Sequence, residues 1–414
     1  MRRAILVALV GTVRWVAAAE SIPPSGGETS PVALFCPPRG WENTSAKAWA
    51  AQIRLPVESE TAYQSSFRAY PSSAISVLGA NPKSIALVAT EDRPDQLTLI
   101  FANKGDSAGD GQLWGGSTQP SGNLEAKVEA AVANDADQIR QAILPVLGKP
   151  RRQGFGDFGK TRETAERWDW EGTAFLLIEQ KGEYTALRIL PTSTADAGGR
   201  SARISDARLR ERMKENVIRR ENGDVVVGNI PMIDQGPKGF CVPATYARVL
   251  LYAGVPADLY LLALLGKTGI GGGTRISSME KSARTLAASY GRSITSISAS
   301  LDLPKLESYF ERGVPLTWAL FRDEAIDRDL TRRMQERPSA DPRTWSQSLE
   351  PKRKAARAIR KNQLNGHVCL LIGCNRKTGE LATSDSWGPE FAERWITVEE
   401  ARALSAGDLG AIVP

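Results

Sequence analysis

The chain has 414 residues, of which 42% are hydrophobic and 24% are charged. These values are ordinary for a globular protein and exclude a mostly disordered, collagen-like or coiled-coil chain. The formal net charge of +6 is a mild bias that requires no polyanionic partner. The one histidine, His367, excludes His-rich zinc sites, two-histidine iron centres and paired-histidine acid–base chemistry. At ~100–200 residues per domain, the length predicts two domains.

The N-terminal residues have the pattern of a secretory signal peptide. Arg2 and Arg3 precede an apolar stretch over 4–13, and residues 16–19 supply a small-residue cleavage pattern. We therefore expect residues 1–19 to be a signal peptide and the protein to be exported to the periplasm, the cell envelope or the medium. A short packed helix is the alternative. No run reaches the ~18 consecutive apolar residues of a membrane-spanning helix, so no membrane span is predicted.

A first folded unit is expected over residues 32–191, after a flexible lead-in at 20–31 that is rich in Ser, Pro and Gly. Branched apolar runs that flank turn residues predict hairpins, and a long helical stretch lies between them. In chain order, these elements are a hairpin of 84–90 and 96–103, a helix over 124–147, and a hairpin of 174–180 and 184–190. The unit is α+β, and we find no catalytic pattern in it.

Residues 192–200 predict a linker to a second unit, 201–414, which opens with an arginine-rich helix over 204–220. The segment 322–361 is highly charged and has few apolar residues. Because it lacks aromatic interleaving and a binding motif, we interpret it as a solvated insertion between two strands rather than as a nucleic-acid patch. No nucleic-acid partner is expected.

The four cysteines do not indicate a disulfide scaffold in a chain of this length. Cys369 and Cys374 lie in one predicted strand, where five residues at ~3.3 Å each separate them by roughly 16 Å, beyond the Cα limit of ~7 Å for a disulfide. We expect both to be small buried hydrophobes, and the state of Cys36 stays open. No Cys-x-x-Cys pair begins a zinc site, so neither a metal nor a cofactor is predicted.

Cys241 is the candidate nucleophile. Small and turn-forming residues lead into it, and a helix is expected from there to Tyr252, with Gly254 closing it. Pro243 is tolerated because the first helical turn makes no use of its missing N–H. At a helix N-terminus the partial positive charge of the helix dipole favours the thiolate, which is the form that attacks a carbonyl carbon.

Three further side chains complete a candidate site with Cys241. His367 opens an apolar strand and is the imidazole available to hold the proton of the thiol. We expect Asp385 to orient this ring by accepting its second N–H, and Trp387 to shield that hydrogen bond from water. Gln235, shortly before Cys241, is expected to donate to a developing oxyanion together with the backbone N–H of Cys241.

The order of these motifs resembles the papain-like cysteine peptidases. Gln precedes Gly-x-Cys, Gly-His opens an apolar strand, and Asp-Ser-Trp-Gly follows. The resemblance covers roughly residues 225–400 and is closest to the bacterial branch that processes bacteriocin leaders after a double glycine. It implies an α+β domain in which the nucleophile helix packs on an antiparallel sheet. The oxyanion-hole glutamine, the nucleophile, the general base and the orienting residue are then Gln235, Cys241, His367 and Asp385. Aspartate in the last role departs from the asparagine of papain but agrees with that branch and with transglutaminase-like enzymes.

A glycine cluster over residues 269–273 fits neither a phosphate loop nor a dinucleotide fingerprint. It is either a flexible loop that lets a peptide approach the cleft or a plain turn between two helices. We expect the substrate-binding residues to be Gly239, Gly272, Gly273 and Trp387.

These observations predict an exported cysteine peptidase that hydrolyses amide bonds in a peptide or protein substrate. Two alternatives stay open. One is a transglutaminase-like acyl transferase on a similar triad. The other is a non-catalytic envelope protein that holds peptides on a protease-like fold. The sequence does not indicate the substrate or the oligomeric state.

Overall fold

A computed structural model describes residues 32–106, 122–157, 161–298, 300–337 and 341–414. The expected signal peptide at 1–19 and the lead-in at 20–31 lie outside these residues, so export stays a prediction. In the part of the chain that is described, no helix combines the length and the apolar character needed to cross a bilayer. Helices and antiparallel sheets are mixed, and the fold is α+β, as expected.

The first half of the chain forms an eight-stranded antiparallel sheet, which we call the N-terminal sheet, in the order β1-β2-β3-β4-β8-β7-β6-β5. Its strands are β1 (Val57–Glu60), β2 (Ser65–Ala69), β3 (Ser84–Thr90), β4 (Arg93–Asn103), β5 (Arg151–Phe155), β6 (Glu163–Trp170), β7 (Thr173–Gln180) and β8 (Tyr184–Pro191). Its helices are α1 (Ala46–Gln52), α2 (Gly122–Leu147) and α3 (Thr192–Asp196). Both expected hairpins and the expected long helix are confirmed, with small shifts at their ends.

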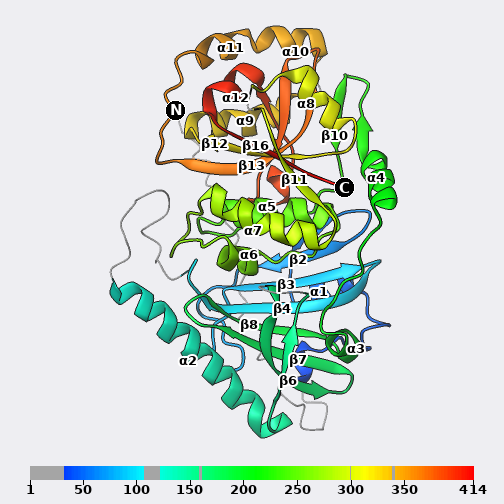
Figure 1. Ribbon diagram of the computed structural model, residues 1–414, viewed down its shortest axis with the longest axis vertical. Coiled ribbons are helices and arrows are strands. Elements are labelled where there is room, and N and C mark those ends of the chain that lie inside the picture. The colour runs from blue at the N-terminus through cyan, green and yellow to red at the C-terminus, as the bar shows by residue number, and fades with distance from the viewer. Residues whose placement is uncertain (1–31, 107–121, 158–160, 299, 338–340) are drawn as a thin grey trace, which may run out of the picture.

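The second half forms another eight-stranded antiparallel sheet, the C-terminal sheet, with the path β11-β16-β12-β13-β10-β9, β14 paired to β13, and β15 paired to β14. Its strands are β9 (Val217–Arg219), β10 (Asp224–Val227), β11 (Ser293–Ile297), β12 (Leu316–Phe321), β13 (Gly366–Asn375), β14 (Glu380–Ser384), β15 (Arg394–Thr397) and β16 (Ser405–Val413). The helices are α4 (Asp206–Glu215), α5 (Cys241–Tyr252), α6 (Leu259–Leu265), α7 (Ile276–Ser289), α8 (Leu303–Phe310), α9 (Glu324–Glu336), α10 (Pro342–Ser348), α11 (Glu350–Ala356) and α12 (Val398–Leu404). Helices α5, α6 and α7 lie between the two sheets (Figure 1).

The two faces of the N-terminal sheet are buried against different partners. Successive residues of a strand point to opposite faces, so one strand contributes to both cores. Phe175 and Leu177 of β7 belong to a core that α1 and α2 cover. Leu176 and Ile178 of the same strand belong to a larger core, which includes residues of α5, α6 and the C-terminal sheet. One face of the N-terminal sheet therefore supports the helices of the second half.

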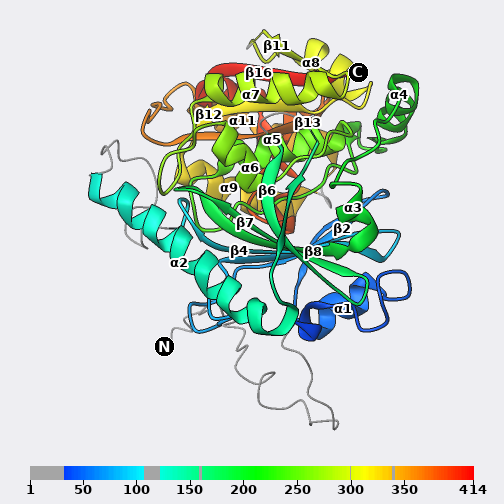
Figure 2. The same cartoon turned by 60° about the horizontal axis from the view of Figure 1, so that its bottom comes forward.

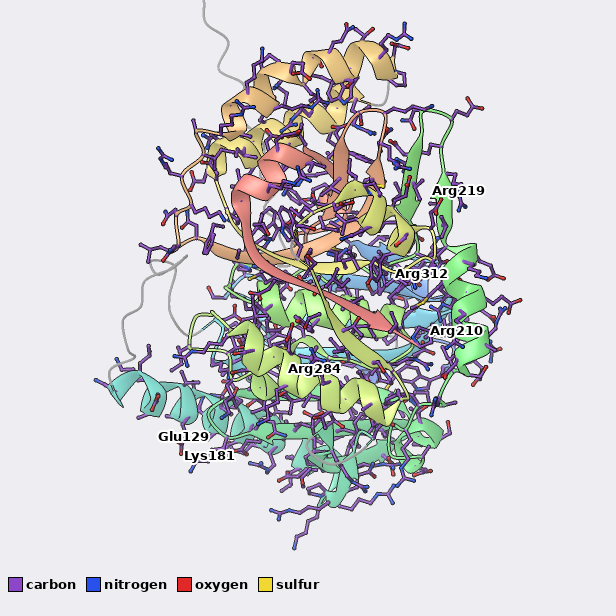
Figure 3. The ribbon with its side chains drawn as sticks, turned by 45° about the horizontal axis from the view of Figure 1, so that its top comes forward. Glu129, Lys181, Arg210, Arg219, Arg284 and Arg312 are labelled. Carbon is purple, nitrogen blue, oxygen red and sulfur yellow. The ribbon has the colours of Figure 1, made fainter. Side chains whose placement is uncertain are left out.

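Helix α2 lies along the outer face of the N-terminal sheet, away from α5, α6 and α7 (Figure 2). Its Ile139 and Ile143 are buried against the sheet. On its exposed side, Glu129 lies beside Lys181 of the β7–β8 turn, at 2.9 Å between carboxylate and ammonium (Figure 3). An exposed pair of this kind adds little to the stability, because solvent screens it. The apolar contacts hold the helix in place.

The segment 322–361 joins β12 to β13, as expected of an insertion between two strands, and most of its described residues are exposed or half-buried, but two of its arginines are buried. Arg333 of α9 is 2% exposed and forms an ion pair with Glu400 at 2.9 Å. Arg337, just after α9, is buried and lies 2.7 Å from Asp224 of β10. Carboxylates from distant parts of the chain neutralise these arginines. The number of charged residues in the segment therefore does not show which of its side chains are exposed.

Two other expectations change at their boundaries. The helix expected over 204–220 is shorter, because α4 ends at Glu215 and the chain continues into β9. Residues 192–200, expected to form a linker, begin with α3, whose Ala195 is buried. The apolar core continues across this point, since residues of both halves of the chain contribute to it. The two halves are packed together rather than tethered.

Candidate active site

Three buried side chains from separate elements meet where α5 packs on the C-terminal sheet. Cys241 is the first residue of α5, which begins and ends where the sequence predicted. His367 lies on β13, and Asp385 follows β14 directly. Antiparallel pairing of these strands sets Leu370 opposite Ser384, which brings the histidine and the aspartate to the same region of the sheet. Cys241, His367 and Asp385 are 7%, 4% and 2% exposed.

The carboxylate of Asp385 is held from two sides. Its Oδ1 is 2.7 Å from Nε2 of His367, and its Oδ2 accepts a hydrogen bond of 2.6 Å from Arg394. Burial raises the pKa of Asp385, but the hydrogen bond from His367 and the charge of Arg394 outweigh it and hold this pKa well below its usual range. Asp385 is therefore ionised at every ordinary pH and accepts the imidazole N–H.

The imidazole of His367 is a strong base. Burial lowers its pKa, but the hydrogen bond to Asp385 and the interaction with Cys241 raise it to about 9. With Nε2 bound to Asp385, Nδ1 has no fully formed hydrogen bond to any described residue. Nδ1 is thus the ring atom available to the sulfur, and catalytic hydrogen bonds often tighten only when substrate binds.

Cys241 differs from the other cysteines, all of which are free thiols in the structure. Burial raises its pKa, but His367 and the backbone N–H groups of Val368 and Val242 lower it, and the net shift is downward. Burial instead raises the pKa of Cys374 in the same sheet to about 12. The interaction between Cys241 and His367 therefore favours the thiolate–imidazolium form of the pair more than burial alone would allow.

Trp387 covers one face of the imidazole. The two rings are stacked, with centroids 4.8 Å apart and planes inclined at 28°. Trp387 also makes a T-shaped contact with Phe391, and the guanidinium of Arg322 lies 4.4 Å from the Trp387 ring centroid. Both partners of the His367–Asp385 hydrogen bond are buried, and shielding of this bond from water by Trp387 stays a prediction. A role for Trp387 in substrate binding stays a prediction.

Gln235 is buried in the loop that leads to the nucleophile. Its Nε2 donates to the carbonyl of Lys238 at 2.7 Å, and its backbone N–H donates to Ser386 at 2.8 Å. An amide nitrogen carries two hydrogens, so one remains for an oxyanion. Oε1 of Gln235 is buried without a hydrogen-bond partner in the described chain. The bond to Ser386 ties this loop to the residue next to Asp385.

The glycine cluster lies in the loop between α6 and α7 and packs against the chain just before Cys241. Gly239 and Gly272 form a parallel bridge, in which Gly273 donates to the Gly239 carbonyl at 2.9 Å. A Cβ on Gly272 would lie 2.3 Å from the Cα of Gly239, so only glycine fits there. This loop therefore supports the approach to the nucleophile. Substrate contact by these three glycines stays a prediction.

Sequence reasoning missed several residues that hold the site together. Thr245 of α5 donates to the carbonyl of Val368, next to His367. Arg248 of α5, 1% exposed, donates to Ser384 Oγ at 2.6 Å and to the carbonyl of Pro231 at 2.9 Å. An arginine within an otherwise apolar helix was a signal for Arg248. No comparable signal marked Arg394.

The comparisons with known proteins add little to this geometry. No protein-family model and no curated protein matches the sequence. Among solved structures, the chain is similar to the peptidase domain of Streptococcus ComA, a bi-functional ABC transporter involved in a quorum sensing pathway. This similarity has a TM-score of 0.28 at 16% sequence identity and covers 44% of this chain and 97% of that chain. A similarity at this level does not define a function.

Proposed function

We propose that this chain is a cysteine peptidase that hydrolyses amide bonds in a peptide or protein substrate. The observation that carries the proposal is the environment of the one histidine: His367 is buried, its Nε2 is 2.7 Å from Asp385, and its ring interacts with Cys241. A thiol at a helix N-terminus, beside an imidazole that a carboxylate orients, is the arrangement that nucleophilic acyl transfer requires.

In the reaction that we propose, the thiolate of Cys241 attacks the carbonyl carbon and an electron pair moves to the carbonyl oxygen. The backbone N–H of Cys241 and Nε2 of Gln235 donate hydrogen bonds to that oxyanion. The imidazolium of His367 gives its proton to the leaving amine as the C–N bond breaks, which leaves a thioester on Cys241.

Hydrolysis of the thioester uses the same groups in reverse. His367, now neutral, takes a proton from water, and the resulting hydroxide attacks the thioester carbonyl. The carboxylic acid leaves, and Cys241 returns as the thiolate with His367 protonated. Asp385 stays ionised throughout and keeps the ring oriented. Arg394 contributes by holding the carboxylate of Asp385 in place.

The test compares Cys241→Ala with Cys369→Ala, a matched change at a buried thiol on β13 whose pKa is raised by burial. The probes are a quenched fluorescent peptide library for hydrolysis and iodoacetamide for thiol labelling, read by mass spectrometry. We expect Cys241→Ala to lose both signals and Cys369→Ala to keep both. Peptide hydrolysis that survives in folded Cys241→Ala protein contradicts the proposal.

A further inference from the structure

The loop that leads to the nucleophile is held by the N-terminal sheet. Residues 234–240, which we call the oxyanion segment, include Gln235. The N–H of Asp234 donates to Glu58 of β1 at 2.8 Å. The hydroxyl of Tyr70, just after β2, donates to the carbonyl of Asp234. Just before the segment, the N–H of Met232 donates to Ser59 at 2.9 Å.

A further contact is an ion pair between a buried lysine and a partly buried aspartate. The side chain of Lys238 is 0% exposed, and its Nζ lies 2.9 Å from Oδ2 of Asp106, which follows β4. The ammonium also lies 5.2 Å from the ring centroid of Tyr70 and 5.3 Å from that of Tyr260. A buried charge is tolerated when it is paired, and aromatic faces stabilise a cation further. Asp106 therefore determines where Lys238 lies.

The position of Lys238 also affects Gln235, because the backbone carbonyl of Lys238 accepts the hydrogen bond from Gln235 Nε2 at 2.7 Å. The fit is close on the side of the N-terminal sheet as well. A Cβ on Gly105 would lie 2.6 Å from Phe240 and 2.7 Å from Lys238. The carbonyl of Lys104 also accepts a hydrogen bond of 2.8 Å from Gly271, in the glycine loop. The turn after β4 thus packs on both the oxyanion segment and the glycine loop.

We propose that Asp106 and Lys238 are positioning residues for the oxyanion hole. Their ion pair fixes the Lys238 carbonyl and, through it, the amide of Gln235. The N-terminal sheet is then a structural part of the active site. This inference rests on the proposed function, in which Gln235 donates to the oxyanion, and it assigns a role to the half of the chain that carries none of the reacting groups.

The experiment separates thiolate formation from oxyanion stabilisation in the full-length protein. Acylation of Cys241 by p-nitrophenyl acetate passes through an oxyanion, whereas alkylation by iodoacetamide does not and reports the thiolate alone. We expect Asp106→Asn and Lys238→Met to slow acylation about 10- to 100-fold, less than the ~10²–10³-fold of losing an oxyanion donor outright. Alkylation should keep its wild-type rate.

Two further variants decide whether the effect passes through Gln235. Asp106→Asn should slow acylation no further when it is added to Gln235→Ala, because residues that act through one another are not additive. Tyr290→Phe removes another contact between the two halves, the hydrogen bond to Asp157, and should leave both rates unchanged. Lys238→Met keeps the apolar stem among the aromatic rings and serves if Asp106→Asn does not fold.

Three results would overturn the inference: wild-type acylation in both variants, equal losses of acylation and alkylation, or additivity with Gln235→Ala. In each of these cases the proposed function stands if Gln235→Ala and Cys241→Ala remain defective. If p-nitrophenyl acetate does not acylate the wild-type protein although iodoacetamide labels Cys241, the proposed function fails, and the inference fails with it.

Discussion

The two sheets have the same number of strands and both bury ion pairs, but those of the C-terminal sheet include the one that holds Asp385 beside His367. The faces of the N-terminal sheet are mainly apolar apart from buried charges such as the Arg188–Glu163 pair, and its contacts with the site come from its edge strand and turns. The C-terminal sheet and the helices packed on it bury arginines that bind carboxylates or backbone oxygens, among them Arg248, Arg333, Arg337 and Arg394. Apolar contacts are non-directional and supply support, whereas buried hydrogen-bonded charges specify orientation. The reacting groups lie among the buried charges.

The largest effect that we expect comes from removing Arg394, a buried arginine of the C-terminal sheet. Arg394→Met leaves Asp385 without its ion pair, so we expect a loss of about 3–5 kcal/mol in the free energy of unfolding. We also expect acylation of Cys241 to slow by about 10- to 100-fold, the range seen when an orienting partner is lost at other sites. Urea unfolding and p-nitrophenyl acetate acylation measure the two effects.

Arg333→Met is the matched control, because Arg333 is equally buried but pairs with Glu400 rather than with Asp385. It should lower stability by a similar amount, about 3–5 kcal/mol, and leave acylation by the folded protein unchanged. If the two variants slow acylation equally, the arginines act on the fold alone and the proposed orienting role of Arg394 is wrong.

A cavity on the outer face of the N-terminal sheet tests whether the two sheets unfold together. Leu177→Ala removes a buried side chain beside α2 and should lower the free energy of unfolding by about 2–5 kcal/mol. Because the core on the opposite face continues into the C-terminal sheet, the buried thiols Cys369 and Cys374 should become reactive at a correspondingly lower urea concentration. Thiol labelling and circular dichroism in urea follow both transitions.

The control for that cavity is Leu144→Ala, the same change at an exposed position of α2, where 42% of the residue is accessible. We expect its effect to stay within about ±0.5 kcal/mol. If the urea concentration at which the buried thiols become reactive does not change in Leu177→Ala, the C-terminal sheet is stable without its neighbour. The N-terminal sheet would then not be the support that we describe.

The smallest expected effect is a pH dependence confined to the C-terminal site. The pKa of His367 is raised to about 9 in the folded state, from an ordinary value of 6.5. The stabilisation from its pairing is therefore complete below about pH 6.5 and is lost as the pH rises through about 9. Peptide hydrolysis should decline over the same alkaline range, because neutral His367 cannot protonate the leaving amine.

The measurement is the pH profile of kcat/KM for a peptide substrate, compared with that of Asp385→Asn. Without the carboxylate the pKa of His367 falls, so the alkaline limb should move to lower pH in the variant. Arg333→Met, which does not contact the ring, should keep the wild-type limb. An alkaline limb at the same pH in all three proteins would show that His367 does not control it.

Local patterns in the sequence determined much of the fold. The helix from Cys241 to Tyr252 has the predicted ends, because turn residues and a glycine mark them. The hairpins of the N-terminal sheet follow from branched apolar runs that flank turn residues, as in β7 and β8. The chain order of Gln235, Cys241, His367 and Asp385 also indicated a common site, and the structure brings His367 into contact with Cys241 and Asp385.

The tertiary structure alone decided which charges are buried and what they hold. Lys238 and Asp106 are 132 residues apart in the chain, and Arg248 and Ser384 are 136 apart, so no local pattern pairs them. The burial of Arg333 and Arg337 in the segment 322–361 was not foreseen for the same reason, since the sequence does not show which charged side chain has a distant partner. Hydrophobic periodicity is local and can be read along the chain, whereas the neutralisation of a buried charge depends on a distant residue that only the folded molecule brings near.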